Sequence, residues 1–176
     1  STVGIVGFGR IGKQVAKRLI GFNTKTIYTD IIEIEQDIEE ELQASRVALE
    51  VLLKESDFVT LHVPLTDATH HMIDKEALDM MKPGATLINC ARGPVVSELA
   101  LIDAMKNRRL GGAGLDVFET EPPPNPNPFA DFENVVLTPH HAPGTRDTMM
   151  IKFREIFANA DRFFSGDRME NEISLI

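Results

Sequence analysis

The chain has 176 residues, of which 43% are hydrophobic, so it can fill the core of one domain, and intrinsic disorder is excluded. Its net charge of −9, from 18 Lys and Arg against 27 Asp and Glu, disfavours binding to nucleic acid and to anionic membranes. We find no apolar run of ~18 residues and no signal-peptide pattern, and the single cysteine, Cys90, excludes an internal disulfide, so we expect a cytoplasmic protein.

Short apolar runs alternate with helical patterns along the chain. Apolar and β-branched clusters predict strands at residues 2–6, 26–29, 57–63, 85–89, 112–115 and 135–137. Helical spacing and stop signals predict helices at residues 10–19, 36–43, 47–54, 75–81, 98–107 and 145–165. This alternation predicts an α/β fold of the Rossmann type, a doubly wound parallel sheet in three layers with right-handed crossovers.

A glycine-rich segment joins the first strand to the first helix. Its glycines, Gly7, Gly9 and Gly12, have the spacing in which one makes the turn, one admits a pyrophosphate and one allows close helix packing. The backbone N–H groups and the positive end of the helix can then meet an anion. The alternative is a glycine-rich turn without a ligand. The position between strand and helix favours phosphate binding.

An acidic residue follows the second strand at the distance typical of dinucleotide-binding proteins. Asp30 lies 30 − 12 = 18 positions after Gly12, close to the ~20 at which a carboxylate accepts hydrogen bonds from the adenosine ribose. The 2′-phosphate of NADP would be repelled by the Asp30 carboxylate. The next residues are Ile31 and Ile32, so no arginine follows that could bind this phosphate. NAD is therefore predicted over NADP. The alternative is a strand-end carboxylate in water.

Three chemically active side chains follow the last three strands of the predicted parallel sheet. Arg92, Glu121 and His140 each come shortly after one of these strands. Strand ends of a parallel sheet meet at one edge, where open α/β folds bind ligands. Taken singly, each has another explanation: an exposed turn arginine, a solvated glutamate before prolines, or half of a surface histidine pair. Together they predict a catalytic group.

Five segments in this order resemble the cofactor domain of the D-isomer-specific 2-hydroxyacid dehydrogenases, and the resemblance covers nearly the whole chain. The matching segments are residues 7–12, 62–66, 89–93, 115–122 and 138–140. The resemblance implies NAD as cofactor and hydride transfer between nicotinamide and a small 2-oxoacid or D-2-hydroxyacid. The more specific labels that it suggests are phosphoglycerate dehydrogenase and glyoxylate or hydroxypyruvate reductase.

The resemblance also implies a role for each catalytic candidate. Arg92 would hold the substrate carboxylate and polarise its carbonyl, because a guanidinium is a permanently charged, forked donor. His140 would exchange the proton near neutral pH. Glu121 would pair with His140, orienting the imidazole and favouring its charged form.

Residues expected to touch the cofactor come from every strand end. By resemblance they are Gly7, Gly9, Arg10, Ile11, Gly12, Asp30, Val63, Pro64, Thr69, Cys90, Ala91, Arg92, Asp116 and His140. Asp116 resembles the aspartate beside the nicotinamide amide. Cys90 is expected to be a packed strand-end thiol rather than a nucleophile, because hydride transfer needs no covalent step. The resemblance assigns no role to His62, His70 or His71. His70 and His71 are expected in a loop, and no metal site is predicted.

The chain departs from the family pattern in three ways. The family commonly has glycine three residues after the catalytic histidine, whereas this chain has Pro143 there, followed by Gly144. Ser97 stands where the family frequently has aspartate, but serine can still cap a helix. The resemblance implies a second domain that contacts the substrate, and we expect this domain to be missing from the present chain. We therefore assign residues 1–170 to the NAD-binding domain and 171–176 to the start of a return crossing. The chain alone is expected to bind cofactor with little turnover.

Two other functions remain open from the sequence. The fold also occurs in NAD-sensing transcriptional corepressors, which keep the same arginine, glutamate and histidine. A formate dehydrogenase relative is suggested by Tyr28-Thr29-Asp30, although that family has glutamine in place of Glu121. Members of the resembled family pair through this domain, so we expect a homodimer. The identity of the 2-hydroxyacid stays open, because the missing domain carries most residues that read the substrate tail.

Overall fold

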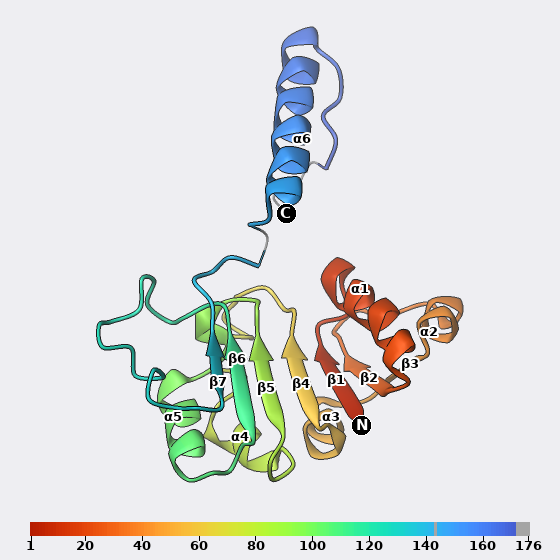
Figure 1. Ribbon diagram of the computed structural model, residues 1–176. Helices are drawn as coiled ribbons and strands as arrows, with labels where there is room; N and C mark the ends of the chain where they lie inside the picture. The colour runs from red at the N-terminus through yellow and green to blue at the C-terminus, as the bar shows by residue number, and fades with distance from the viewer. Residues whose placement is uncertain (143, 172–176) are drawn as a thin grey trace. The chain divides into compact units, whose positions relative to one another are not determined.

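A computed structural model describes residues 1–142 and 144–171 (Figure 1). The chain divides into two compact units, one of residues 1–140 and one that begins at His141. Residues 172–176, which make up most of the predicted return crossing, and Pro143 lie outside the described residues.

The first unit contains a seven-stranded sheet in which every pair of neighbouring strands is parallel. Its order is β3-β2-β1-β4-β5-β6-β7, so the Rossmann-type prediction is confirmed. The strands are β1 (Thr2–Val6), β2 (Lys25–Thr29), β3 (Ala44–Arg46), β4 (Phe58–Leu61), β5 (Thr86–Asn89), β6 (Gly112–Leu115) and β7 (Val135–Leu137).

Two strands differ from the prediction by more than one residue. The edge strand β3 is absent from the sequence-based prediction because it has three residues, of which only Ala44 is buried, so it shows no apolar run. The strand β4 ends at Leu61 rather than at residue 63. The His62 N–H still donates to the Val6 carbonyl at 2.7 Å, and Pro64, which has no N–H, follows two residues later.

The helices of the first unit lie within about two residues of their predicted ranges. They are α1 (Arg10–Leu19), α2 (Gln36–Leu42), α3 (Leu49–Glu55), α4 (Lys75–Met80) and α5 (Glu98–Lys106), with short 3₁₀ helices η1 (Ile20–Phe22) and η2 (Gly93–Val95). The start of α3 moves from 47 to 49 because the Val47 N–H donates to the Tyr28 carbonyl beside β3. Ser97 caps α5 as predicted, accepting from the Ala100 N–H at 3.4 Å.

Successive residues of β1, an interior strand, pack on opposite faces of the sheet. Ile5 belongs to a core cluster with Ala16 of α1 and Leu42 of α2. Val6 belongs to a second cluster with side chains of α3, α4 and α5. Helices therefore cover both faces, which gives the predicted three layers, because side chains alternate along a strand.

One aromatic pair fixes the start of the glycine-rich segment. Phe8 stacks on Tyr28 of β2 with ring centroids 3.9 Å apart, and both rings are fully buried. The Tyr28 hydroxyl donates to Glu39 Oε1 at 2.7 Å. Burial, followed by the neighbouring Glu39 carboxylate, raises the pKa of Tyr28, so this hydroxyl remains a donor. The loop after β1 is thus anchored to the core beneath it.

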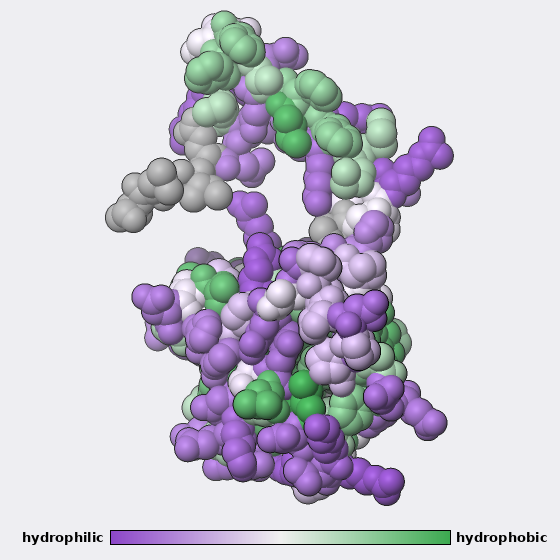
Figure 2. All heavy atoms as spheres, turned by 90° about the vertical axis from the view of Figure 1, so that its left-hand side faces the viewer, coloured by the Kyte–Doolittle hydropathy of each residue, from purple (hydrophilic) through white to green (hydrophobic). Residues whose placement is uncertain are grey.

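The second unit contains one long helix, α6 (Arg146–Ser165), close to the predicted range 145–165. Thr145 caps its start by accepting from the Thr148 N–H, and Gly166 ends it in the left-handed conformation. Figure 2 shows apolar side chains along this helix, and the large exposed ones are Met149, Met150, Ile151, Phe153, Ile156, Phe157, Phe163 and Phe164. None of the helices in the described part of the chain has the length and apolarity needed to cross a membrane.

We predict that Gly93→Ala destabilises the first unit by about 1–3 kcal/mol. A Cβ at this position would lie 1.9 Å from the carbonyl carbon and oxygen of Phe118, which are backbone atoms that must shift. Chemical denaturation measures the free energy of unfolding. The matched control is Gly21→Ala, whose Cβ would meet no described atom within 4 Å. Equal effects of the two substitutions would contradict the close approach.

Candidate functional site

The loops that follow the strands lie at one edge of the sheet, toward which the arrowheads of Figure 1 point. This is the carboxyl edge, where open α/β sheets bind ligands. All the residues predicted to form the site in the first unit leave the sheet at this edge or lie in the first turn of α1.

The loop after β1 has the geometry that an anion requires. Gly7 has a positive φ of 92°, and a Cβ there would lie 2.8 Å from the backbone of His62. A Cβ at Gly12 would lie 2.2 Å from the Gly7 carbonyl oxygen. At Gly9, by contrast, a Cβ would meet no described atom within 4 Å. The first and third glycines are therefore needed for close packing, and the middle one opens onto free space.

The start of α1 offers unpaired donors to this space. Gly9 is the N-cap and supplies no side-chain bond, and the first turn carries no acidic residue. The N–H groups of this turn have no partner within the helix and lie at its positive end. A pyrophosphate fits such a cradle, and Gly9, Arg10 and Ile11 would face it.

Asp30, at the end of β2, is bound to the same loop. Its Oδ2 accepts from the Phe8 N–H at 2.5 Å and its Oδ1 accepts from the Ile32 N–H at 2.9 Å. Each carboxylate oxygen has a second lone pair, so Asp30 can still accept from ribose hydroxyls.

Arg46 lies beside Asp30, which the sequence did not reveal. Its Nη2 donates to the Asp30 backbone carbonyl at 2.8 Å, and its Nη1 lies 3.6 Å from Glu33 Oε1. The missed strand β3 brings this arginine to the adenosine end of the predicted site. A search limited to Ile31 and Ile32, directly after Asp30, could not find it, because Arg46 lies 16 positions further along the chain and reaches Asp30 only through the pairing of β3 with β2.

The loop after β4 carries the predicted cofactor contacts Val63, Pro64 and Thr69. The Thr69 hydroxyl donates to the Pro64 carbonyl at 2.6 Å and accepts from the Thr66 N–H at 2.8 Å. These bonds close the loop on itself and keep all three residues near the strand end.

Asn89, the last residue of β5, holds the turn that presents Arg92. Its buried side chain accepts from the Ala91 N–H and donates to the Arg92 carbonyl, both at 3.0 Å. The Arg92 guanidinium is exposed and donates through Nη1 to the Ala91 carbonyl at 2.7 Å. Asn89 belongs to one of the five family-like segments, but only the folded turn shows that it braces Arg92.

The expectation that Cys90 is packed is wrong. The residue is at the strand end as predicted, but it is exposed. The alternation of strand β5 stops at Asn89, whose side chain folds into the turn, so the next residue points outward. Desolvation by neighbouring atoms, with the nearby Asp116 carboxylate, raises the pKa of the Cys90 thiol and keeps it uncharged.

Glu121 and His140 meet across the ends of β6 and β7. His140 Nδ1 lies 2.7 Å from Glu121 Oε2, and Glu121 Oε1 accepts from the Phe118 N–H at 3.0 Å. An ionised carboxylate only accepts, so Nδ1 is the donor and Nε2 is left for another partner. The hydrogen bond from His140 lowers the pKa of Glu121, the Phe118 N–H adds to this, and the Arg92 charge contributes.

The backbone of His140 is fixed by the buried Asp116. The His140 N–H donates to the Asp116 carbonyl at 2.7 Å, and the Thr138 hydroxyl donates to Asp116 Oδ1 at 2.5 Å. His140 has a positive φ of 52°, which is uncommon outside glycine and turns its ring toward Glu121. Asp116 thus holds the backbone of His140 in place.

A pocket of about 440 Å³ borders the pair. The two side chains are 43% and 36% exposed, so a small molecule can reach them. Its lining is Phe118, Glu121, Pro122, Pro123, Asn127, Leu137, Thr138, Pro139 and His140. Within residues 1–142 and 144–171, no group of three or more His, Cys, Asp or Glu side chains could hold a metal ion.

The structure therefore brings the three catalytic candidates to one place, with Glu121 bound to His140 and within electrostatic reach of Arg92. His62 lies apart from this group. Its Nε2 is 3.0 Å from the Thr60 hydroxyl, and burial lowers its pKa. His70 and His71 lie in the loop between β4 and α4, as expected, with their rings 4.0 Å apart.

Comparison with known proteins gives one matching family model. Residues 1–142 match the D-isomer specific 2-hydroxyacid dehydrogenase, NAD binding domain. Among curated proteins, a glyoxylate reductase of Korarchaeum cryptofilum is 47% identical over 98% of this chain and 52% of its own length. The glyoxylate reductase of Pyrococcus furiosus is 53% identical over 94% of this chain and 49% of its own. The chain spans about half the length of these relatives.

Solved structures of the same kind superpose closely. The apo D-mandelate dehydrogenase of Rhodotorula graminis matches with a TM-score of 0.91 and 37% identity, over 99% of this chain and 51% of that one. A D-lactate dehydrogenase from Aquifex aeolicus, complexed with NAD and lactic acid, matches with a TM-score of 0.86 and 37% identity, over 94% and 54%.

We predict that Glu121→Gln lowers the stability of the chain near neutral pH and that the difference disappears in acid. The folded-state pKa of Glu121 lies below its ordinary value of 4.5. Its charge therefore stabilises the fold fully above that value, and the contribution is lost as the pH falls through the lowered pKa. Because the side chain is 36% exposed, we expect less than ~1 kcal/mol.

Thermal unfolding of both proteins from about pH 3 to about pH 7 measures this difference. The melting temperatures should converge at the acid end. A gap that stays constant or widens in acid would mean that the charge of Glu121 does not stabilise the fold.

Proposed function

The chain belongs to the D-isomer-specific 2-hydroxyacid dehydrogenase family as its NAD-binding domain, and from this membership we propose that the intact protein is an NAD-dependent 2-hydroxyacid dehydrogenase. It would transfer a hydride between nicotinamide and a small 2-oxoacid or D-2-hydroxyacid. The observation that carries the proposal is the 2.7 Å bond between His140 Nδ1 and Glu121 Oε2, within electrostatic reach of Arg92.

Each of these side chains has a defined task in the proposed reaction. The exposed Arg92 guanidinium binds the substrate carboxylate and draws electron density from its carbonyl oxygen. His140 donates a proton from Nε2 to that oxygen during reduction and takes it back during oxidation. Glu121 holds the ring by Nδ1 and stabilises the imidazolium. Bound NADH supplies the hydride.

The cofactor would lie along the carboxyl edge. The N–H groups at Gly9, Arg10 and Ile11 would bind its pyrophosphate, and Asp30 its adenosine ribose. Asp116, whose side chain already accepts from Thr138, would lie near the nicotinamide end. The further contacts that we propose are Gly7, Gly12, Val63, Pro64, Thr69, Cys90, Ala91, Arg92 and His140.

Glyoxylate and similar small 2-oxoacids are the proposed substrates. Curated relatives are named glyoxylate reductase, and one is named glycerate dehydrogenase. We assign residues 1–170 to the cofactor domain and expect the rest of the protein to supply the remaining substrate contacts. A homodimer and a cytoplasmic location, which suits the single cysteine, complete the proposal.

The other two readings have less support. These relatives carry the names of reductases and dehydrogenases, which does not favour a corepressor-like sensor. A formate dehydrogenase relative is disfavoured by Glu121, because the carboxylate here is hydrogen-bonded to the imidazole.

Calorimetric titration of this chain with NADH and, separately, NADPH tests the cofactor part of the proposal without the rest of the protein. We expect saturable binding that prefers NADH. Absence of binding to either would contradict a preformed site. Turnover is then tested in the intact protein by NADH oxidation with glyoxylate and with hydroxypyruvate, and absence of turnover with any 2-oxoacid would overturn the proposed activity.

In the intact protein, His140→Ala should lower the rate of 2-oxoacid reduction by ~10²–10⁴-fold, the usual contribution of a positioned acid. NADH affinity should change far less, because the cradle at α1 does not include this ring. Stopped-flow kinetics and NADH titration give the two quantities. Comparable losses in both would contradict the role of His140 as acid.

Asp30→Ala should weaken NADH binding by ~10–100-fold, the usual cost of losing hydrogen bonds to a charged group, and narrow the preference for NADH over NADPH. NADPH should gain because Arg46 lies beside the vacated position. The control is the double variant Asp30→Ala, Arg46→Ala, in which that gain should be lost. An unchanged affinity ratio in the single variant would mean that another residue reads the ribose.

A further inference from the structure

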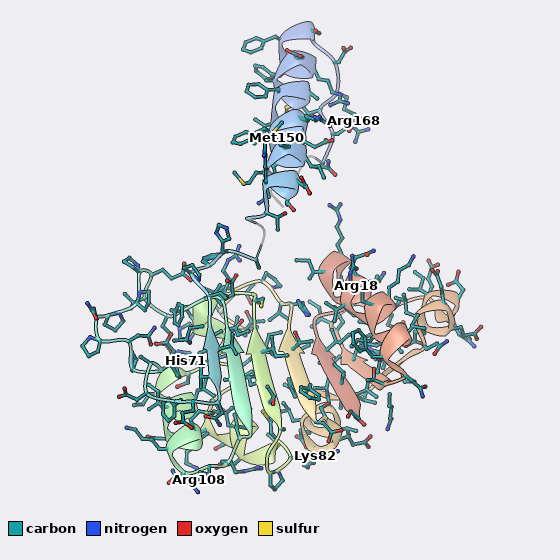
Figure 3. The ribbon with its side chains drawn as sticks, in the orientation of Figure 1. Arg18, His71, Lys82, Arg108, Met150 and Arg168 are labelled. Atoms are coloured by element: carbon teal, nitrogen blue, oxygen red, sulfur yellow. The ribbon has the colours of Figure 1, made fainter. Side chains whose placement is uncertain are left out.

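Three loops at the carboxyl edge are joined by hydrogen bonds that centre on Glu119, a residue outside the catalytic group. Glu119 Oε1 lies 2.9 Å from His71 Nε2 and accepts from the Glu98 N–H, also at 2.9 Å. In return, the Glu119 N–H donates to Glu98 Oε1 at 2.7 Å. Because an ionised carboxylate only accepts, His71 Nε2 is the donor in the first bond. His71 is labelled in Figure 3.

Each partner belongs to a loop that carries part of the proposed site. Glu119 is two residues before Glu121 in the turn after β6. Glu98 is the first residue of α5 and ends the segment that begins with Arg92. His71 lies in the loop between β4 and α4, which also contains the proposed cofactor contacts. Glu119 therefore links the Arg92 loop, the Glu121 turn and the cofactor loop.

The backbone supports the same arrangement. The His71 N–H donates to the Pro94 carbonyl at 2.8 Å, which joins the cofactor loop to the Arg92 loop. His71 itself has a positive φ of 49°, so its ring leaves the loop in an uncommon direction. Between the Arg92 loop and the Glu121 turn, Gly93 lies directly against the Phe118 carbonyl. The side-chain bonds of Glu119 add to this backbone contact.

The two carboxylates of the network, Glu98 and Glu119, both accept hydrogen bonds. Two carboxylates, Glu98 and Glu119, lie close together, and burial followed by the Glu119 charge raises the pKa of Glu98, although the Glu119 N–H opposes this. Glu119 accepts at the first residue of α5, where the helix favours negative charge, and also accepts from His71. The His71 and Glu119 side chains are 37% and 33% exposed, so their bond adds little to stability.

We propose that Glu119 is a positioning residue for the proposed dehydrogenase reaction. By holding Glu98 and His71, it sets the place of Arg92 relative to the Glu121–His140 pair, and thus the distance from the substrate anchor to the proton donor. Glu119 itself touches neither substrate nor cofactor in this assignment. The inference rests on the proposed function and adds to it a determinant of substrate orientation.

The kinetic test uses three variants of the intact protein. Glu119→Ala should lower kcat for a 2-oxoacid such as glyoxylate by ~10–100-fold and raise its KM, because a misplacement of about 1 Å has such effects. The Kd of NADH should stay within ~2-fold, since the bonds of Glu119 do not involve the α1 cradle. Glu119→Gln should restore most of the rate, because its amide oxygen can still accept both N–H groups. Glu133→Ala, an exposed glutamate outside the network, is the matched control.

A second measurement needs no turnover and uses the present chain. In the imidazole ¹⁵N spectrum, His71 should carry its proton on Nε2, and the Glu98 amide should exchange slowly with solvent. Glu119→Ala should remove both signatures, and Glu119→Gln should keep them. The same signatures in all three proteins would overturn the network.

The kinetic outcomes separate the two proposals. A wild-type intact protein that reduces no 2-oxoacid would overturn the proposed function, and the positioning role with it. An active wild type with an equally active Glu119→Ala variant would overturn the positioning role alone. A loss of rate in Glu119→Ala that Glu119→Gln does not restore would also overturn the positioning role. The same holds for a loss of rate that is matched by an equal loss of NADH affinity, because either result would indicate a general structural defect.

Discussion

The common direction of the seven strands is the constraint on which the site depends. Parallel pairing sends every strand-to-helix turn to the same edge, so residues separated by up to 140 − 7 = 133 positions, from Gly7 to His140, lie on one rim. Each of those turns is then held by a different local device. Asp30 binds the loop after β1, Asn89 braces the turn after β5, and Asp116 fixes the backbone of His140. The sheet brings the groups together, and these bonds determine their orientation.

Buried polar groups beneath the rim perform most of this orientation. Asn89 and Asp116 are 1% and 3% exposed, whereas the groups assigned to the chemistry are open to solvent. This division suits a site that must both hold fixed geometry and admit a small charged substrate. It also explains how a strongly acidic chain can bind anionic ligands. Helix N–H groups and one arginine, rather than net charge, provide the local positive potential.

Periodicity predicted the fold well wherever an element is long or buried. The helix at residues 10–19 matches because its apolar residues recur at helical spacing, and the strand at 2–6 matches because it is a short run of apolar and β-branched residues. The sequence did not predict strand β3, because pairing with β2, rather than its own composition, makes this segment a strand. For the site, motif order predicted which strand ends meet. The side-chain directions of Cys90, Arg46 and Glu119 depend on turn conformation and cross-loop pairing, which no spacing rule encodes.

Asp30, the proposed ribose contact, also has a structural task. Its carboxylate closes the glycine-rich loop through the Phe8 N–H, and Phe8 in turn is stacked on Tyr28 in the core. A change of cofactor preference at this position is therefore also a change in loop order. In evolution or in engineering, a lineage that moves toward a phosphorylated cofactor must first provide the Phe8 amide with another acceptor. A short polar side chain at position 30 meets this requirement, whereas the removal of all side-chain oxygen does not.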